Sequence, residues 1–340
     1  ERPLPASPPG PAGAVSEPGW DRDFNEVRGQ DHAVRGVEIA AAGGHHLLLI
    51  GPPGSGKTMI ASRIPTILPP MSEEEVFETI KIYSVAGMLG DHGPPLRPFR
   101  APHHSASDAA IIGGGRGLPG EITLAHNGVL FLDELPEFKN NIIQSLRQPL
   151  EEGVVTVSRA EYRLVYPADF MLVAAMNPCP CGFLFDTTRR CRCSPGHISR
   201  YFTKVSGPIF DRIDLQVQMG PPAPADLFDP PAGESSADIR ERVCAARETQ
   251  RRRYRGTPIR FNAQLQGRTA ASRVTCTGRS RSLLLDAVGR YRMSGRSCQG
   301  VLKVARTIAD LQGKEAVGEE HLLEALSYRE VERVLFTVPG

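Results

Sequence analysis

The sequence predicts an α/β protein: a three-layer α/β/α core around a parallel sheet, followed by a smaller helical domain. Three short apolar segments are typical of buried strands, at 46–50, 128–133 and 170–175. Helical patterns precede or separate them, at 30–42, 57–68, 72–86 and 139–151. Strands that alternate with helices indicate parallel pairing in one central sheet. The C-terminal third contains only helical patterns, at 238–254, 280–293, 298–312 and 319–329.

Shifts in composition divide the 340 residues into domains. Residues 1–19 are rich in Pro, Gly, Ala and Ser, which predicts a flexible linker. The α/β core is expected at 20–222. Beyond it we expect a second linker at 223–237, a helical domain at 238–330 and a tail at 331–340. Within the core, the Gly- and Pro-rich segment 90–120 is expected to be irregular, and 154–166 alternates as a β-hairpin does.

Composition also narrows the class of protein. No apolar segment reaches the roughly 18 residues that a membrane span needs, and no secretory signal is visible. We therefore expect a cytoplasmic protein with no membrane partner. The net charge of +2 does not require nucleic acid. The arginine-rich stretch 247–255 is interpreted as a solvated face, with a patch that contacts phosphates as the alternative. Seven cysteines, an odd number, argue against a disulfide framework.

One segment matches the phosphate-binding pattern G-x-x-x-x-G-K-[ST] between a predicted strand and a predicted helix. Its residues are Gly51, Pro52, Pro53, Gly54, Ser55, Gly56, Lys57 and Thr58. Gly54 and Gly56 allow backbone N–H groups to surround phosphates. Lys57 is expected to reach the β- and γ-phosphates, and Thr58 to supply a hydroxyl to Mg²⁺. The segment therefore predicts ATP and Mg²⁺ as cofactors.

Polar side chains end the other two predicted strands of the core. Asp133 ends the strand at 128–133 and Glu134 follows it, where ligands bind at the carboxyl ends of parallel strands. Asp133 suits a magnesium ligand, and Glu134 suits the base that orients the attacking water. Asn177 ends the third strand, where it is expected to help hold that water. These residues predict ATP hydrolysis as well as binding.

Arg212 lies between Asp211 and Asp214 in an apolar setting. One interpretation is a structural ion pair within the chain. The other is a catalytic arginine inserted into the nucleotide site of a neighbouring subunit, where it would offset negative charge in the transition state. The second interpretation requires an oligomer.

Four of the seven cysteines form two closely spaced pairs. They are Cys179, Cys181, Cys191 and Cys193. Tetrahedral zinc accepts four thiolates, although the C-x-C spacing is tighter than the usual C-x₂₋₄-C. The segment 179–193 is therefore interpreted as a zinc loop, with unliganded reduced thiols as the alternative.

These segments together resemble the magnesium-chelatase-like AAA+ ATPases of the ComM/YifB family. The resemblance covers about residues 20–330 and rests on long motifs. They are FNEVRGQ at 24–30, RPFRAPHH at 97–104, PGEITLAHNGVLFLDELPEF at 119–138, MNPCPCG at 176–182, GPIFDRIDL at 207–215 and VARTIADL at 304–311. The segment 51–58, the pair Asp133 and Glu134, Asn177, and Arg212 match Walker A, Walker B, sensor 1 and the arginine finger.

The resemblance implies an AAA+ P-loop core with a helical lid, assembled as a hexameric ring. It also implies an N-terminal Lon-protease-like domain, which the opening linker would follow. Gln30 lies in a segment that packs near the adenine in such proteins, and Arg296 matches the position of sensor 2. Both are therefore expected to bind nucleotide. Arg306 lies further along the lid and is the residue expected to pack or pair within it instead.

The resemblance further implies how such a ring would reach DNA. The segment at about 95–120 matches an insert in helix 2, and 154–166 matches the pre-sensor-1 hairpin, which faces the central pore in helicases. Arg159 and Arg163 are then the DNA-contact candidates, with ordinary surface arginines as the alternative. The expected activity is a ring-shaped motor acting on DNA in branch migration during natural transformation or recombination. The alternative is a chelatase-type ATPase that remodels a partner protein.

Overall fold

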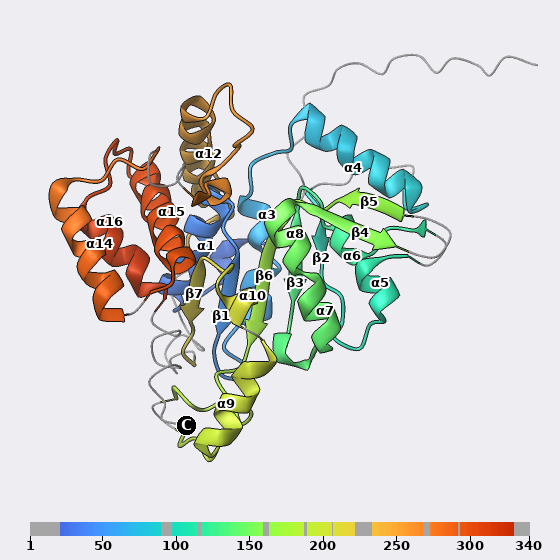
Figure 1. The fold of residues 1–340 in the computed structure, drawn as a ribbon, viewed down its shortest axis with the longest axis horizontal. Helices are drawn as coiled ribbons and strands as arrows, with labels where there is room; N and C mark the ends of the chain where they lie inside the picture. Colours follow the sequence, from blue (N-terminus) through green and yellow to red (C-terminus); the bar gives the residue numbers. More distant parts are fainter. Residues whose placement is uncertain are drawn as a thin grey trace, which may run out of the picture.

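The computed structural model describes residues 21–89, 97–114, 117–158, 163–186, 189–205, 207–221, 233–267, 273–291 and 293–329. Its central sheet has five parallel strands in the order β2-β3-β6-β1-β7 (Figure 1). The strands are β1 (Leu47–Ile50), β2 (Phe99–Arg100), β3 (Val129–Leu132), β6 (Met171–Met176) and β7 (Leu215–Gln218). The predicted α/β core with a parallel sheet is confirmed. All the carboxyl ends of these strands meet at one edge, where ligands bind in such sheets.

Helices surround the sheet and continue into the C-terminal domain. Those of the core are α1 (Asp31–Gly43), α2 (Lys57–Ala61), α3 (Ile64–Ile67), α4 (Glu73–Val85), α5 (Asp108–Ile112), α6 (Glu121–Leu124), α7 (Asn140–Ser145), α8 (Arg147–Glu152), α9 (Pro195–Lys204) and α10 (Gly207–Phe210). Those of the helical domain are α12 (Ser236–Arg253), α14 (Gly278–Tyr291), α15 (Gly295–Leu311) and α16 (Glu319–Ser327). Figure 1 shows α14, α15 and α16 together on one side of the sheet. No helix among the described residues is both long and apolar enough to span a bilayer.

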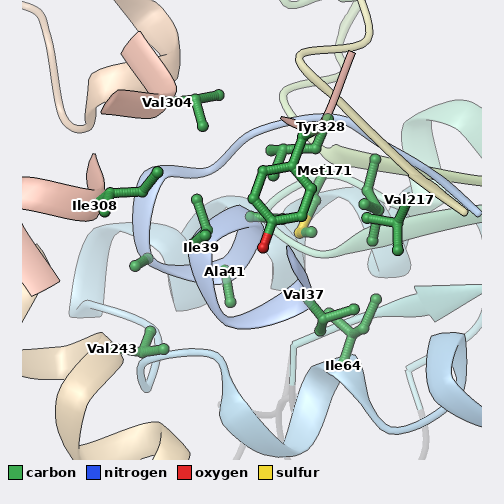
Figure 2. Close-up of a cluster of buried hydrophobic side chains, with 14 of the residues drawn as sticks. Val37, Ile39, Ala41, Ile64, Met171, Val217, Val243, Val304, Ile308 and Tyr328 are labelled. Carbon is green, nitrogen blue, oxygen red and sulfur yellow. The ribbon is translucent and has the colours of Figure 1, made fainter. Parts of the chain in front are cut away.

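Alternate side chains of each strand point to opposite faces of the sheet, which creates two apolar layers. In β1, Leu47 and Leu49 belong to one core, whereas Leu48 and Ile50 belong to the other. The first core holds α1, α3, α12 and α15. Figure 2 shows it around α1, with Val37, Ile39 and Ala41 near Ile64, Val217, Val243, Val304 and Ile308. Because helices of both domains bury side chains in this layer, the helical domain is packed onto the core.

A buried polar junction joins the helical domain to the start of β1. His45 Nδ1 lies 2.8 Å from Asp214 Oδ2, and His45 Nε2 lies 2.8 Å from Thr307 Oγ1. Lys303 Nζ lies 3.1 Å from Asp214 Oδ2. Buried polar groups need such partners, since an unpaired one costs about 1–3 kcal/mol. The junction therefore stabilises one packing of α15 against the core.

The segment 90–120, expected to be irregular, contains regular structure in its described part. Strand β2 pairs with β3 at the edge of the sheet, and α5 follows it. A two-residue strand is too short to show alternation, so only its partner reveals it. The pairing depends on Gly128, where a Cβ atom would lie 2.1 Å from the Pro98 carbonyl oxygen.

Two predicted helices are each divided in the structure. The pattern at 57–68 becomes α2 and α3, and the pattern at 139–151 becomes α7 and α8. Pro65 and Pro149 lie near these breaks, and proline has no N–H to continue the helical hydrogen bonds. The hairpin at 154–166 is present as antiparallel strands β4 (Val154–Ser158) and β5 (Arg163–Pro167). Figure 1 shows it on the side of the sheet away from the helical domain.

Candidate nucleotide site

The P-loop lies between β1 and α2, as the sequence pattern predicts. Gly54 and Gly56 have φ values of 79° and 88°, a left-handed conformation that glycine adopts without strain. Lys57 Nζ donates to the carbonyl oxygens of Gly51 and Pro52, at 2.8 and 2.9 Å. Burial lowers the pKa of Lys57, and the nearby Asp133 and Glu134 partly offset this effect. A Cβ atom added at Gly54 would meet nothing within 4 Å, so the loop faces open space at this position.

The structure brings the two halves of the predicted magnesium site together. Thr58 Oγ1 donates to Asp133 Oδ2 at 2.7 Å, across from α2 to the end of β3. A hydroxyl and a carboxylate are oxygen ligands of the kind that Mg²⁺ prefers. The chemistry and the spacing of this donor pair therefore fit Mg²⁺.

Glu134 lies beside Thr58 and Asp133, and its backbone conformation is strained. Its φ is 52°, one of two positive values among described residues other than glycine. Such strain is retained where surrounding structure enforces it, often at functional sites. Its Oε2 lies 3.5 Å from Nδ1 of His104, which the sequence analysis did not single out as a site residue. The HH pair at 103–104 was the available signal, but only the fold shows that it reaches Glu134.

Asn177 closes the site from the end of β6. Its Oδ1 accepts from Lys57 Nζ at 3.3 Å, so the end of β6 and the P-loop lysine are in contact. A cavity of about 380 Å³ lies between Glu134, Asn177 and one face of α9. That face contributes His197, Arg200, Tyr201 and Lys204 to the lining. The cavity therefore places cationic side chains beside the predicted water-orienting glutamate.

Gln30 lies at the entrance of α1, near the end of β7. Its Nε2 donates to the Gly220 carbonyl oxygen at 3.1 Å. The next residue back along that segment, Met219, abuts the P-loop: a Cβ at Gly51 would lie 2.7 Å from its carbonyl oxygen. Gln30 is thus joined to the strand end that borders the P-loop, rather than to the loop itself.

Arg212 and Arg296 lie together, although they come from different domains. The Nη2 atoms of both bond to Oε1 of Glu151 in α8, and the Arg296 bond measures 3.0 Å. Arg306, in contrast, is buried within the helical domain and bonds to Asp310 at 3.1 Å. Glu151 is a residue that sequence reasoning missed, because nothing in its local pattern distinguishes it from other glutamates of an exposed helix face.

The four clustered cysteines converge as predicted. Their sulfur atoms all lie within 4.8 Å of one another, and those of Cys179 and Cys181 are 3.3 Å apart. Burial, with the neighbouring thiols Cys181 and Cys191, raises the pKa of Cys179 to about 12. A bound cation reverses such an effect, since coordination deprotonates a thiol. The loop also touches the P-loop, because a Cβ at Gly182 would lie 2.6 Å from Pro53 Cδ.

Only one of the two DNA-contact candidates lies among the described residues. Arg163 is exposed at the start of β5. Arg159 lies outside the described residues.

Two family models together match nearly the whole described chain. The model of magnesium chelatase subunit ChlI matches residues 23–227, and that of the ChlI C-terminal region matches residues 233–329. The chain belongs to the magnesium-chelatase-like AAA+ family. Within that family its similarity is to the ComM/YifB branch, and the family implies ATP and Mg²⁺.

Individual relatives of this family support the same assignment. The chain is 45% identical to YifB of Salmonella typhimurium over 338 residues, covering 98% of this chain and 64% of YifB. It is 45% identical to the competence protein ComM of Haemophilus influenzae over 317 residues, covering 92% of this chain and 61% of ComM. Lon protease 2 of Bacillus subtilis is 26% identical over 192 residues, 49% of this chain and 34% of that protein. The chain thus spans under two thirds of the YifB and ComM lengths.

Proposed function

We propose that this chain binds and hydrolyses ATP with Mg²⁺, and that it works as a subunit of a hexameric, cytoplasmic ring that moves DNA. The convergence of Lys57, Thr58, Asp133, Glu134 and Asn177 at one sheet edge carries the ATPase proposal. Their contacts join the P-loop and the start of α2 to the carboxyl ends of β6 and β3. Mg²⁺ supplies charge neutralisation at the phosphates when bound.

The chain's own residues divide the work of hydrolysis. Lys57 neutralises phosphate oxygens, while Thr58 and Asp133 hold the metal. Glu134 orients the attacking water and accepts its proton, and Asn177 keeps that water in place. Arg212 acts on the site of the next subunit, and Arg296, which shares its glutamate partner, acts beside it. An arginine that acts in this way typically contributes about 10³–10⁵ to kcat.

The four-thiol cluster is proposed to hold a structural Zn²⁺. The supporting observation is the convergence of four sulfur atoms from two C-x-C pairs. Zinc with four thiolates is a closed structural site, so the metal would shape the loop at 179–193 rather than react.

The DNA-acting role is supported by the likeness to ComM and by the exposed hairpin β4–β5. A second candidate is a chelatase-type ring that remodels a partner protein. It is favoured by the family models, by the likeness to a Lon protease and by the net charge of only +2.

DNA-stimulated ATPase activity distinguishes the two candidates. We expect single-stranded or branched DNA to raise the hydrolysis rate at low salt, and Arg163→Glu to weaken that stimulation by about 10-fold, because phosphate contacts dominate such binding. Arg251→Glu is the matched control, since Arg251 is 80% exposed and its partner Glu248 lies on its own helix. The absence of both stimulation and DNA binding at low salt would exclude the DNA motor and favour the protein remodeller.

A further inference from the structure

Two arginines from different domains meet at one carboxylate oxygen. Arg212 follows α10 in the core, whereas Arg296 lies in the first turn of α15 in the helical domain. Both bond to Oε1 of Glu151, near the end of α8. The contact therefore joins three elements that are far apart in the sequence.

The arrangement places two like charges close together, with one opposite charge between them. Arg212 is 11% exposed, Glu151 44% and Arg296 58%. Two guanidinium groups repel each other unless a carboxylate offsets that repulsion. The cluster of Arg212, Glu151 and Arg296 keeps a net charge of +1. Its first arginine is nearly buried, whereas Arg296 is exposed. A cationic cluster of this kind suits a phosphate that approaches from outside the chain.

We propose that Glu151 is a positioning residue that holds Arg212 and Arg296 as one clamp for the nucleotide phosphates of a neighbouring subunit. This inference rests on the proposed role of Arg212 in the site of the next subunit. A guanidinium carries its N–H donors in a rigid planar fork, so one bond to Glu151 orients the whole fork. Preorganised charge needs no rearrangement at the moment of reaction, which is why it accelerates the chemical step.

The same geometry links the two domains. Because α15 carries Arg296, the clamp is complete only while the helical domain remains packed on the core. Glu151 therefore couples the position of the helical domain, through Arg296, to the orientation of Arg212. The neighbouring Glu152 differs, since its Oε2 accepts from Gln148 of its own helix at 3.0 Å.

The test is the variant Glu151→Gln, with Glu152→Gln as the matched control. We expect Glu151→Gln to lower kcat by about 10- to 100-fold, as misplacement of a catalytic group does, with ATP affinity and thermal midpoint nearly unchanged. We expect Glu152→Gln to retain the wild-type rate. ATP affinity is measured by titration with a fluorescent ATP analogue, which does not depend on turnover.

Mixed assemblies provide a readout that a merely structural role would not affect. Subunits with Glu151→Gln keep their own P-loop, and Lys57→Ala subunits keep an intact clamp. Mixing the two is expected to restore part of the lost rate, whereas mixing Glu151→Gln with Arg212→Ala restores none, because both changes damage the same clamp.

Each other result contradicts the proposal in a recognisable way. An unchanged kcat for Glu151→Gln means that the arginines do not need it, and an increased kcat means that Glu151 restrains them. Loss of rate without restoration by Lys57→Ala subunits indicates a structural defect only. If Arg212→Ala and Lys57→Ala subunits also fail to complement each other, the proposed role of Arg212 is wrong and the clamp is wrong with it. If they do complement, only the role of Glu151 is overturned.

Discussion

Lys57 and Glu134 lie at the same edge of the sheet, but they are expected to act at different stages of turnover. Lys57→Ala removes the charge that meets the phosphates, so ATP binding should weaken by about 10-fold or more. Glu134→Gln keeps the size of the side chain but removes the base, so binding should persist while turnover falls by about 10²–10⁴. Binding of a fluorescent ATP analogue and phosphate release measure the two effects separately. Near-normal turnover in Glu134→Gln would show that another group activates the water.

His45 is a buried histidine outside the nucleotide site, and it makes stability depend on pH. Burial lowers its pKa, Asp214 opposes that effect, and Lys303 and Arg247 lower the pKa further. Burial alone would raise the pKa of Asp214, but Lys303 and His45 hold it well below its usual range. Both groups therefore bind fewer protons folded than unfolded, so stability is highest above about pH 6.5 and falls as the pH is lowered.

This sign gives a specific expectation for His45→Gln. The variant should lose about 1–3 kcal/mol of unfolding free energy at pH 8, because Asp214 and Thr307 lose their buried contacts with His45. Its further decline between pH 7 and pH 5 should be shallower than that of the wild type. Urea unfolding at several pH values measures both, with His197→Gln, at an exposed position, as the matched histidine control. Equal slopes for His45→Gln and wild type would assign the pH dependence elsewhere.

At the residue scale, the sequence predicted the roles of those residues that belong to a local motif. Lys57 and Thr58 belong to a contiguous motif, and Asp133 follows an apolar strand. His104 and Glu151 show no such local signal, because each acquires a partner only when distant segments meet. Arg212 was left between an ion pair and a catalytic role, and its bond to Glu151 is compatible with both.

The cysteine loop is the element whose composition makes the sharpest prediction. Purified protein should contain about one equivalent of zinc per chain, as a four-thiolate site does. The double change Cys191→Ser and Cys193→Ser should abolish it and lower the thermal midpoint. Because the loop touches Pro53 through Gly182, ATP affinity should fall as well. Metal analysis by mass spectrometry and the fluorescent ATP titration measure these effects.

Cys244→Ser provides the matched control for the loop, since Cys244 lies in α12, far along the chain from the cluster. It should leave the metal content unchanged. Less than half an equivalent of zinc in wild-type protein, after purification without chelators, would favour reduced unliganded thiols.

Elements with a strong period were predicted more accurately than short ones. The helix predicted at 72–86 is α4 (Glu73–Val85), and a capping box between Ser72 and Glu75 fixes its start. Strand β2 was missed because two residues carry no period, and its pairing with β3 stabilises it instead. The pairs α2–α3 and α7–α8 were each predicted as one helix, because a continuous apolar pattern does not reveal a break near Pro65 or Pro149.

At the scale of the whole molecule, the candidate site predicts that the chain assembles into an oligomer. Lys57 bonds to Gly51, Pro52 and Asn177, whereas Arg212 bonds to Glu151, so the two belong to separate clusters of one chain. If Arg212 completes the site of the next subunit, Lys57→Ala and Arg212→Ala should each inactivate a uniform ring. An equal mixture should regain about one quarter of the wild-type activity, since half the P-loops and half the arginines are intact in a head-to-tail ring.

Two measurements check this expectation. Phosphate release from the mixture reports the regained activity, and light scattering reports whether the variants still assemble. A mixture that assembles but regains nothing would place Arg212 in its own subunit as a structural ion pair.

The sequence by itself determined the α/β class, the P-loop, the acidic strand end and the clustered cysteines. Each depends on residues close together in the chain, where spacing and hydrophobic period restrict the local conformation. Only the tertiary structure decided that Asn177 contacts Lys57, that His104 reaches Glu134, and that Arg212 and Arg296 share Glu151. These contacts depend on strand order and on the packing of the helical domain, because burial of two apolar layers brings distant segments together.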